Sequence, residues 1–199
     1  MAKFFKSTAF KCTIVLVCLM IVFGGGLAIL NSLWSVSPEE RTMRALQKIY
    51  DTNAEIKYET IYEEDSAKEE DKKDKQFDGV GKINKIYQVG DDLIFQSTGE
   101  KGYNNGTITV WVQVKTTIVS GQNQYTIEKV VLEGYEKQTL MSQLKSSYYE
   151  KFNGAIEGDK TFTTEAGSGR HTNPISGATK SATAGNNAVN CVIKYLGGK

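Results

Sequence analysis

Apolar and polar residues alternate over residues 107–115, and this pattern constrains the fold more than any other feature of the sequence. The two predicted faces consist of Ile108, Val110, Val112 and Val114 on one side and Thr109, Trp111, Gln113 and Lys115 on the other. A period of two is typical of a half-buried strand in an antiparallel sheet. We therefore expect Val110 and Val112 to be buried and Gln113 to be exposed.

The segments around this strand predict further strands and a helix in the same domain. A turn at Gly121-Gln122-Asn123 predicts that residues 125–132 return as a partner strand. Shorter strands are indicated at 83–87 and 93–95, on either side of Gly90-Asp91-Asp92, and residues 138–152 are predicted to form a helix. Strands followed by helices indicate an α+β fold, an antiparallel sheet with packed helices.

The last part of the chain is predicted to be a helix from Ala182 onward. Apolar residues recur there at three- and four-residue steps, at Ala184, Ala188, Cys191, Val192 and Tyr195. The preceding stretch, 173–181, is rich in hydroxyl and small residues. Such residues before a helix either bind a phosphate at the helix N-terminus or simply cap the helix, and the spacing alone leaves both possibilities open.

The stretch Ser176-Gly177-Ala178-Thr179-Lys180-Ser181 resembles the flavinylation motif of the FMN-binding domain family. This domain occurs in the G subunit of the Rnf electron-transport complex and in the C subunit of the sodium-translocating NADH:quinone reductase. The resemblance implies that a flavin transferase attaches FMN through a phosphoester to the hydroxyl of Ser181. It also implies a recognition core formed by Ser176, Gly177, Ala178 and Thr179.

Two further segments can be compared with the same family. Gly102-Tyr103-Asn104-Asn105-Gly106 resembles its Gly-Tyr-Gly-Gly segment, which implies a cofactor-binding role for Tyr103, although the residues alone indicate a turn. The family's Glu-Thr-Pro-Gly corresponds to Glu136-Lys137-Gln138-Thr139, in which only Glu136 matches, and Asn173 stands where the family usually has Asp. The resemblance implies an FMN-binding domain over 77–199. Tyr103, Trp111 and Tyr135 are candidates to pack on the flavin ring or in the core.

The N-terminal part of the chain predicts a membrane anchor. Lys3, Lys6 and Lys11 precede an uncharged run over 12–34. Its apolar part, 12–30, has 19 residues, close to the ~20 that cross a bilayer as a helix. The lysines favour a cytoplasmic N-terminus over 1–11, a transmembrane helix over 12–34 and an extracytoplasmic domain after it. A cleaved signal peptide is the alternative.

Residues 35–76 are predicted to connect the anchor to the domain. Ser37, Pro38 and Glu40 are typical of a helix start with a capping box. Residues 63–75 are almost all charged and indicate a solvated loop.

Composition excludes several classes of function. The net charge of +1 provides no basic field for nucleic acid. With one histidine, His171, and one cysteine outside the apolar run, Cys191, the sequence indicates neither a zinc site nor a disulfide framework.

The function predicted from these features is that of a membrane-anchored, Rnf-like electron carrier with covalent FMN. Its expected partners are the flavin transferase and other redox subunits of a membrane oxidoreductase complex. A flavin-free subunit with the same fold and an extracellular binding module are the alternatives.

Overall fold

The computed structural model describes residues 8–34, 37–158, 160–164, 170–171 and 177–197 of the chain. Two compact units are present, Met1–Thr42 and Met43–Lys199. The boundary between them falls inside one helix, and each unit is described by itself.

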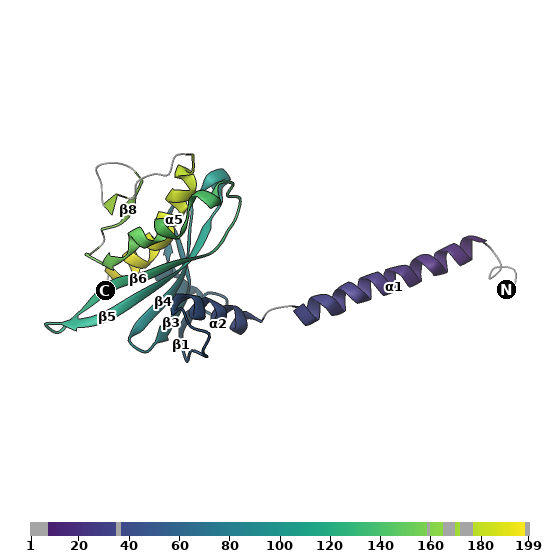
Figure 1. Ribbon diagram of the computed structural model, residues 1–199, viewed down its shortest axis with the longest axis horizontal. Helices are drawn as coiled ribbons and strands as arrows, with labels where there is room; N and C mark the ends of the chain where they lie inside the picture. Colours follow the sequence, from purple (N-terminus) through teal and green to yellow (C-terminus); the bar gives the residue numbers. More distant parts are fainter. Residues whose placement is uncertain (1–7, 35–36, 159, 165–169, 172–176, 198–199) are drawn as a thin grey trace. The chain divides into compact units, whose positions relative to one another are not determined.

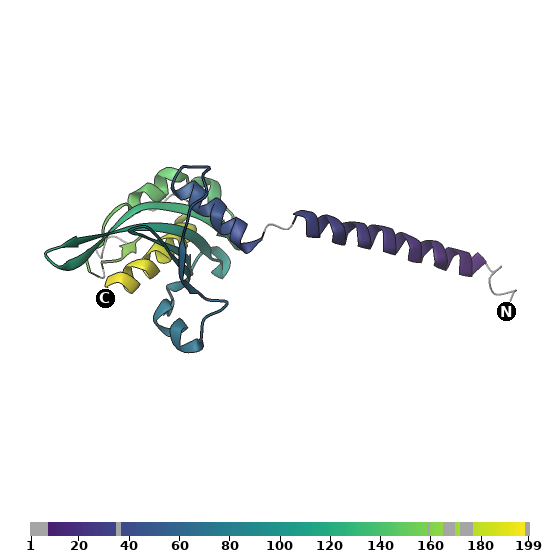
Figure 2. The same cartoon turned by 90° about the horizontal axis from the view of Figure 1, so that it is seen from below.

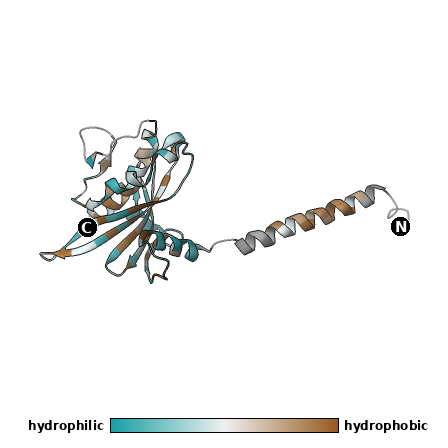
Figure 3. Ribbon diagram, in the orientation of Figure 1, coloured by the Kyte–Doolittle hydropathy of each residue, from teal (hydrophilic) through white to brown (hydrophobic). Residues whose placement is uncertain are grey.

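The first unit contains the long helix α1, Thr8–Trp34, and the start of α2, Pro38–Ile49. Large apolar side chains from Ile14 to Leu27 on α1 are exposed, and Figure 3 shows the hydrophobic colouring along this helix. Among the described residues, no helix combines the length and apolar character needed to cross a membrane. The backbone N–H of Glu40 donates to Ser37 Oγ at 3.1 Å, which confirms the predicted N-cap of α2.

The second unit is built on a seven-stranded antiparallel sheet with the order β1-β3-β4-β5-β6-β7, in which β2 also pairs with β3 (Figure 1). The strands are β1 Glu59–Glu63, β2 Gln76–Phe77, β3 Gly81–Val89, β4 Asp92–Gly99, β5 Ile108–Val119, β6 Gln122–Tyr135 and β7 Gly154–Ala155. Helices pack against this sheet, so the predicted α+β class is confirmed.

The hairpin of β5 and β6 follows from the sequence pattern. Val112 pairs with Val130, and Val119 pairs with Gln122 across a two-residue turn. Both turn residues, Ser120 and Gly121, have positive φ, at 53° and 80°, as a twisted hairpin requires. The strand pair predicted over 107–119 and 125–132 is therefore confirmed, and the second strand, β6, is longer than expected.

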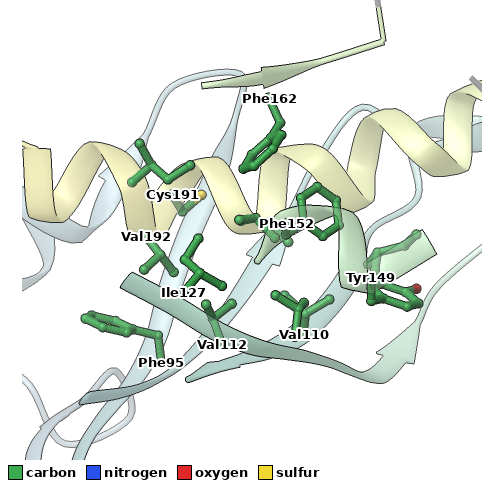
Figure 4. Packing of buried hydrophobic residues seen from close by; sticks show 14 of the residues in the cluster. Phe95, Val110, Val112, Ile127, Tyr149, Phe152, Phe162, Cys191 and Val192 are labelled. Atoms are coloured by element: carbon green, nitrogen blue, oxygen red, sulfur yellow. The ribbon is translucent and has the colours of Figure 1, made fainter. Parts of the chain in front are cut away.

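Helix α5, Thr179–Gly197, lies along one face of the sheet, and a core forms between them (Figures 1 and 2). Val110 and Val112 are fully buried there, as predicted. Figure 4 shows the core side chains contributed by the sheet, by α5 and by the segment before β7. Those labelled are Phe95, Val110, Val112, Ile127, Tyr149, Phe152, Phe162, Cys191 and Val192.

A second apolar cluster covers the opposite face of the sheet. It contains Leu46 and Ile49 of α2 together with Tyr87, Ile94 and Trp111. Trp111 is therefore buried although Thr109 and Gln113, which precede and follow it on the same face of β5, are polar. Gln113 is half-buried, because its Nε2 donates to Asp92 Oδ2 at 2.7 Å, so the prediction that it is exposed is wrong.

The single helix predicted over 138–152 is wrong. The chain instead forms three short turns, η3 Met141–Gln143, α4 Ser146–Tyr149 and η4 Glu150–Phe152. Leu144 ends the first turn with φ −86° and ψ 73°, outside the helical region. The apolar residues at 141, 144, 148, 149 and 152 are all buried in the core, which outweighs the local preference for one continuous helix.

The charged stretch 63–75 is also more ordered than a solvated loop. It contains α3, Glu69–Lys72, and η1, Lys73–Lys75. Lys75 is 8 % exposed, since its ammonium donates to Asp71 O and Asp74 Oδ1 and lies 4.7 Å from the Tyr62 ring centre. After β7, the parallel pair β8 Phe162–Thr163 and β9 Arg170–His171 precedes α5.

Isoleucine-to-valine substitutions at one buried and one exposed position test this core. Ile127→Val removes a methylene from a side chain that is 1 % exposed, so we expect a loss of about 0.5–1.5 kcal/mol in the free energy of unfolding. Ile118→Val removes the same group near the hairpin tip, where the side chain is 75 % exposed, and should change stability by less than about 0.5 kcal/mol. Urea unfolding of both variants measures the difference. Equal losses would contradict the described packing.

Candidate functional site

The motif that resembles the flavinylation site forms the start of α5. The helix begins at Thr179, with the N–H of Ala182 donating to Ala178 O at 2.9 Å, and not at Ala182 as predicted. Thr179, Lys180 and Ser181 thus occupy its first turn. Backbone N–H groups in a first turn have no intrahelical partner and favour a negative charge nearby. Gly177, with φ +81°, supplies the left-handed residue before the helix.

The position of this turn depends on close packing of α5 against β4. A Cβ on Gly99 would lie 2.0 Å from Ala184 O and 2.2 Å from Ala188 N, so the strand and the helix backbone approach each other directly. Ser97, which is fully buried, donates its hydroxyl to Ala188 O at 2.8 Å. The spacing of small residues on α5 therefore sets the distance between helix and sheet.

Buried polar groups orient the same helix. The Tyr148 hydroxyl lies 2.8 Å from Ala182 O and 2.7 Å from Asn186 Oδ1. Asn190 Nδ2 donates to Phe162 O at 2.8 Å, and its Oδ1 accepts the Phe162 N–H at 2.7 Å. The sequence analysis did not single out Tyr148, Asn186 or Asn190. The sequence signal that could have found the two asparagines is their four-residue spacing, which places them on one face of a helix.

Cys191 belongs to the core of this helix and not to the site. Burial of its side chain raises the pKa of the thiol to about 12. The group therefore stays protonated near neutral pH, and a protonated thiol is a poor nucleophile and metal ligand. This agrees with its predicted place on the apolar face of the C-terminal helix.

The segment that resembles Gly-Tyr-Gly-Gly forms a tight turn after β4. It contains the short helix η2, Tyr103–Asn105. The N–H of Gly102 donates to Gly106 O at 3.0 Å, and the N–H of Gly106 donates to Tyr103 O at 2.9 Å. The Tyr103 side chain is 45 % exposed. The aromatic ring is thus presented at the surface by a turn closed on itself.

The tertiary structure brings this turn next to the start of α5. One pocket of about 330 Å³ is lined by Tyr103, Thr139, Leu140, Gly177, Thr179, Lys180 and Ser181. Tyr103 therefore shares one pocket with three other predicted site residues, Gly177, Thr179 and Ser181, although it lies more than seventy positions before them in the sequence. The volume is within the usual range of ligand pockets, about 300–1,000 Å³.

The remaining predicted residues lie elsewhere. Ala178 is buried, and Ser176 and Asn173 lie outside the described residues, as does the side chain of His171. Trp111 packs against Tyr87 in the second cluster, with ring centres 6.1 Å apart. Tyr135 lines a different groove, together with Lys82 and Glu133. Of the aromatic candidates for a flavin ring, only Tyr103 is at the pocket.

Ser181 is held by a residue that the sequence analysis did not select for the site. Its side chain is 3 % exposed, and its Oγ donates to Gln138 Oε1 at 2.8 Å. Gln138 lies between β6 and η3, at the place compared with the family's Glu-Thr-Pro-Gly segment. No sequence signal pointed to it, because its contact with Ser181 spans 43 positions along the chain.

The described residues of the pocket offer hydroxyl groups, one cation and one aromatic ring. An amide oxygen orients a hydroxyl but takes no proton from it near neutral pH. Within the described part of the chain, no group of three or more His, Cys, Asp and Glu side chains is placed to hold a metal ion. An unassisted serine is a weak nucleophile, and the described residues that line the pocket include no carboxylate, imidazole or thiol to act as its base.

Comparisons with protein-family models, with curated proteins and with solved structures give no match for this chain.

A glycine substitution tests whether the site depends on helix packing. Gly99→Ala places a methyl group against the α5 backbone, so we expect a loss of about 1–3 kcal/mol in the free energy of unfolding. Gly134→Ala is the matched control, because a Cβ there meets nothing within 4 Å. It should change stability by less than about 0.5 kcal/mol. Thermal unfolding of the two variants provides the measurement, and equal stability would refute the close approach.

Proposed function

We propose that this chain is a membrane-anchored electron carrier to which FMN is attached by a phosphoester at Ser181, as in Rnf-like membrane redox complexes. The observation that carries the proposal is the placement of the Ser-Gly-Ala-Thr-Lys-Ser motif. Its last hydroxyl lies in the first turn of α5 and lines a pocket that also contains Tyr103. The bound flavin would supply the redox chemistry.

The residues around Ser181 fit a phosphate ester. The first turn of α5 provides backbone N–H groups and the positive end of the helix dipole, both of which favour phosphate charge. Lys180 contributes a cation to the pocket lining. The pocket is open beside Gly177, since a Cβ added to this residue would meet only Leu140, at 3.6 Å. The exposed ring of Tyr103 offers an aromatic surface.

The attachment step is a transfer of a flavin monophosphate group. A separate transferase would use a flavin dinucleotide as the donor. The bond formed joins Ser181 Oγ to the flavin-side phosphorus, and the bond broken is the P–O bond of the diphosphate. The nucleoside monophosphate leaves, and the serine proton passes to a base of the transferase. No electrons are transferred in this step.

The anchor is a proposal of the same kind. We propose that residues 12–34 hold the protein in the cell membrane, with the N-terminus in the cytoplasm and Met43–Lys199 outside. The apolar side chains exposed along α1 support it, because exposed residues such as Ile21 and Phe23 are stable in lipid and unfavourable in water. A covalent tether suits an exported cofactor, since it prevents loss to the medium.

A flavin-free subunit with this fold is the second candidate. The observation in its favour is that the Ser181 hydroxyl is almost fully buried and already hydrogen-bonded. Attachment must therefore break the contact with Gln138.

Mass spectrometry of coexpressed protein tests the proposal. With a flavin transferase, the peptide containing Ser181 should gain the mass of the FMN group, and Ser181→Ala should abolish it while costing only about 1 kcal/mol of stability. Ser181→Thr keeps an acceptor oxygen and should retain labelling. Thr179→Ala, the neighbouring hydroxyl, should leave the modified position unchanged. An unmodified wild-type Ser181 beside an active transferase would favour the flavin-free subunit.

Protease treatment of intact cells tests the orientation. We expect an added protease to cleave the Met43–Lys199 unit and to leave the N-terminal segment cell-associated, because a bilayer shields the apolar helix and the cytoplasmic end. The same treatment of lysed cells is the control. Complete protection in intact cells, with cleavage after lysis, would contradict the proposed orientation.

A further inference from the structure

Every hydrogen-bonding group of the Gln138 side chain is in use. Its Nε2 donates to Tyr103 O at 3.4 Å and to Glu136 O at 3.1 Å. Its Oε1 accepts the Tyr103 N–H at 3.1 Å and the Ser181 hydroxyl at 2.8 Å. The side chain is 8 % exposed. A buried amide with two donors and two lone pairs occupied is fully satisfied.

The neighbours also determine which way the amide faces. Tyr103 O and Glu136 O only accept hydrogen bonds, so the amide nitrogen must face them. The backbone N–H of Tyr103 only donates, so the amide oxygen must face it. The group that meets Ser181 is therefore the oxygen, and the serine is obliged to donate its proton to it.

The Tyr103 turn is shaped around this amide. A Cβ on Gly102 would lie 2.3 Å from Gln138 Nε2, and one on Gly106 would lie 2.5 Å from the same atom. Glycine at both positions lets the turn close against the side chain. One residue thus connects the Tyr103 turn with the first turn of α5, and both elements line the pocket.

We propose that Gln138 is the positioning residue for the acceptor hydroxyl of Ser181. The hydrogen bond fixes the position of the Ser181 oxygen before attack. For attack the hydroxyl turns its proton from the amide to the base of the transferase, and an oxygen lone pair meets the incoming phosphorus. Gln138 removes no proton; it keeps the oxygen in one place before this step, which lowers the entropic part of the barrier. This inference rests on the proposed function, because the acceptor role belongs to the flavin attachment described above.

Attachment has a consequence for Gln138 itself. A phosphoester oxygen carries no hydrogen, so Ser181 cannot donate to Gln138 once the phosphorus is bound. The amide oxygen then retains the Tyr103 N–H alone. The hydrogen bond between Ser181 and Gln138 therefore stabilises the flavin-free chain and is absent from the modified chain.

The rate of labelling tests the positioning role. Full-length protein is incubated with a flavin transferase and flavin dinucleotide, and the modified fraction is followed by intact mass. Gln138→Met has similar length and no hydrogen-bonding group, so labelling should be slower by roughly ten- to a hundredfold. Gln138→Asn keeps an amide that can accept from Ser181 and donate to the two carbonyl groups, on a side chain one methylene shorter, and should recover part of the rate.

Urea midpoints separate positioning from a general structural role. In flavin-free protein, Gln138→Met and Ser181→Ala should be non-additive, because each removes the same hydrogen bond. Gln138→Met should also lower the midpoint more in flavin-free than in modified protein, and a residue that only supports the Tyr103 turn would lower both equally. If Gln138→Met does not fold, Gln138→Leu, which also has no hydrogen-bonding group, provides the same comparison.

The outcomes distinguish this inference from the proposed function. Slow labelling of Gln138→Met with partial recovery in Gln138→Asn supports the positioning role. Labelling of Gln138→Met at the wild-type rate or faster overturns it and leaves Ser181 as the acceptor. Wild-type protein that is never modified overturns the proposed function and the positioning role together.

Discussion

The direct contact between β4 and α5 is the constraint on which the site depends. Gly99 has no side chain, so the strand reaches the backbone of α5 at Ala184 and Ala188. The same strand ends at Gly99 and leads within four residues to Tyr103. One point of close packing thus positions both halves of the pocket, because the helix that carries Ser181 and the turn that carries Tyr103 are fixed relative to a common strand.

The closely packed elements of the site surround side chains of low reactivity. The Ser181 hydroxyl donates a hydrogen bond to the Gln138 amide, and burial keeps the Cys191 thiol of the same helix protonated. Such an arrangement does not promote a reaction by itself. This agrees with the proposal that a separate transferase attaches the flavin, because a serine without a base is a weak nucleophile.

Several sequence predictions failed where tertiary contacts opposed a local pattern. Residues 138–152 have helical spacing, yet burying Met141, Tyr149 and Phe152 in one core breaks the helix into short turns. Gln113 occupies a position that the alternating pattern predicts to be exposed. Its side chain is instead half-buried and donates a hydrogen bond to Asp92 on the neighbouring strand. A pattern in one segment contains no information about the segment that packs on it, so these outcomes could not be predicted from either segment alone.

The sequence by itself determined the α+β class, the β5–β6 hairpin, the N-cap at Ser37 and the amphipathic C-terminal helix, because periodicity and capping are properties of neighbouring residues. It also singled out Ser181 and Tyr103, by resemblance. Only the tertiary structure placed these two residues in one pocket and brought Gln138 to the serine hydroxyl. Contacts that join positions more than forty residues apart depend on how helix and sheet pack, and that packing is decided by the close approach at Gly99.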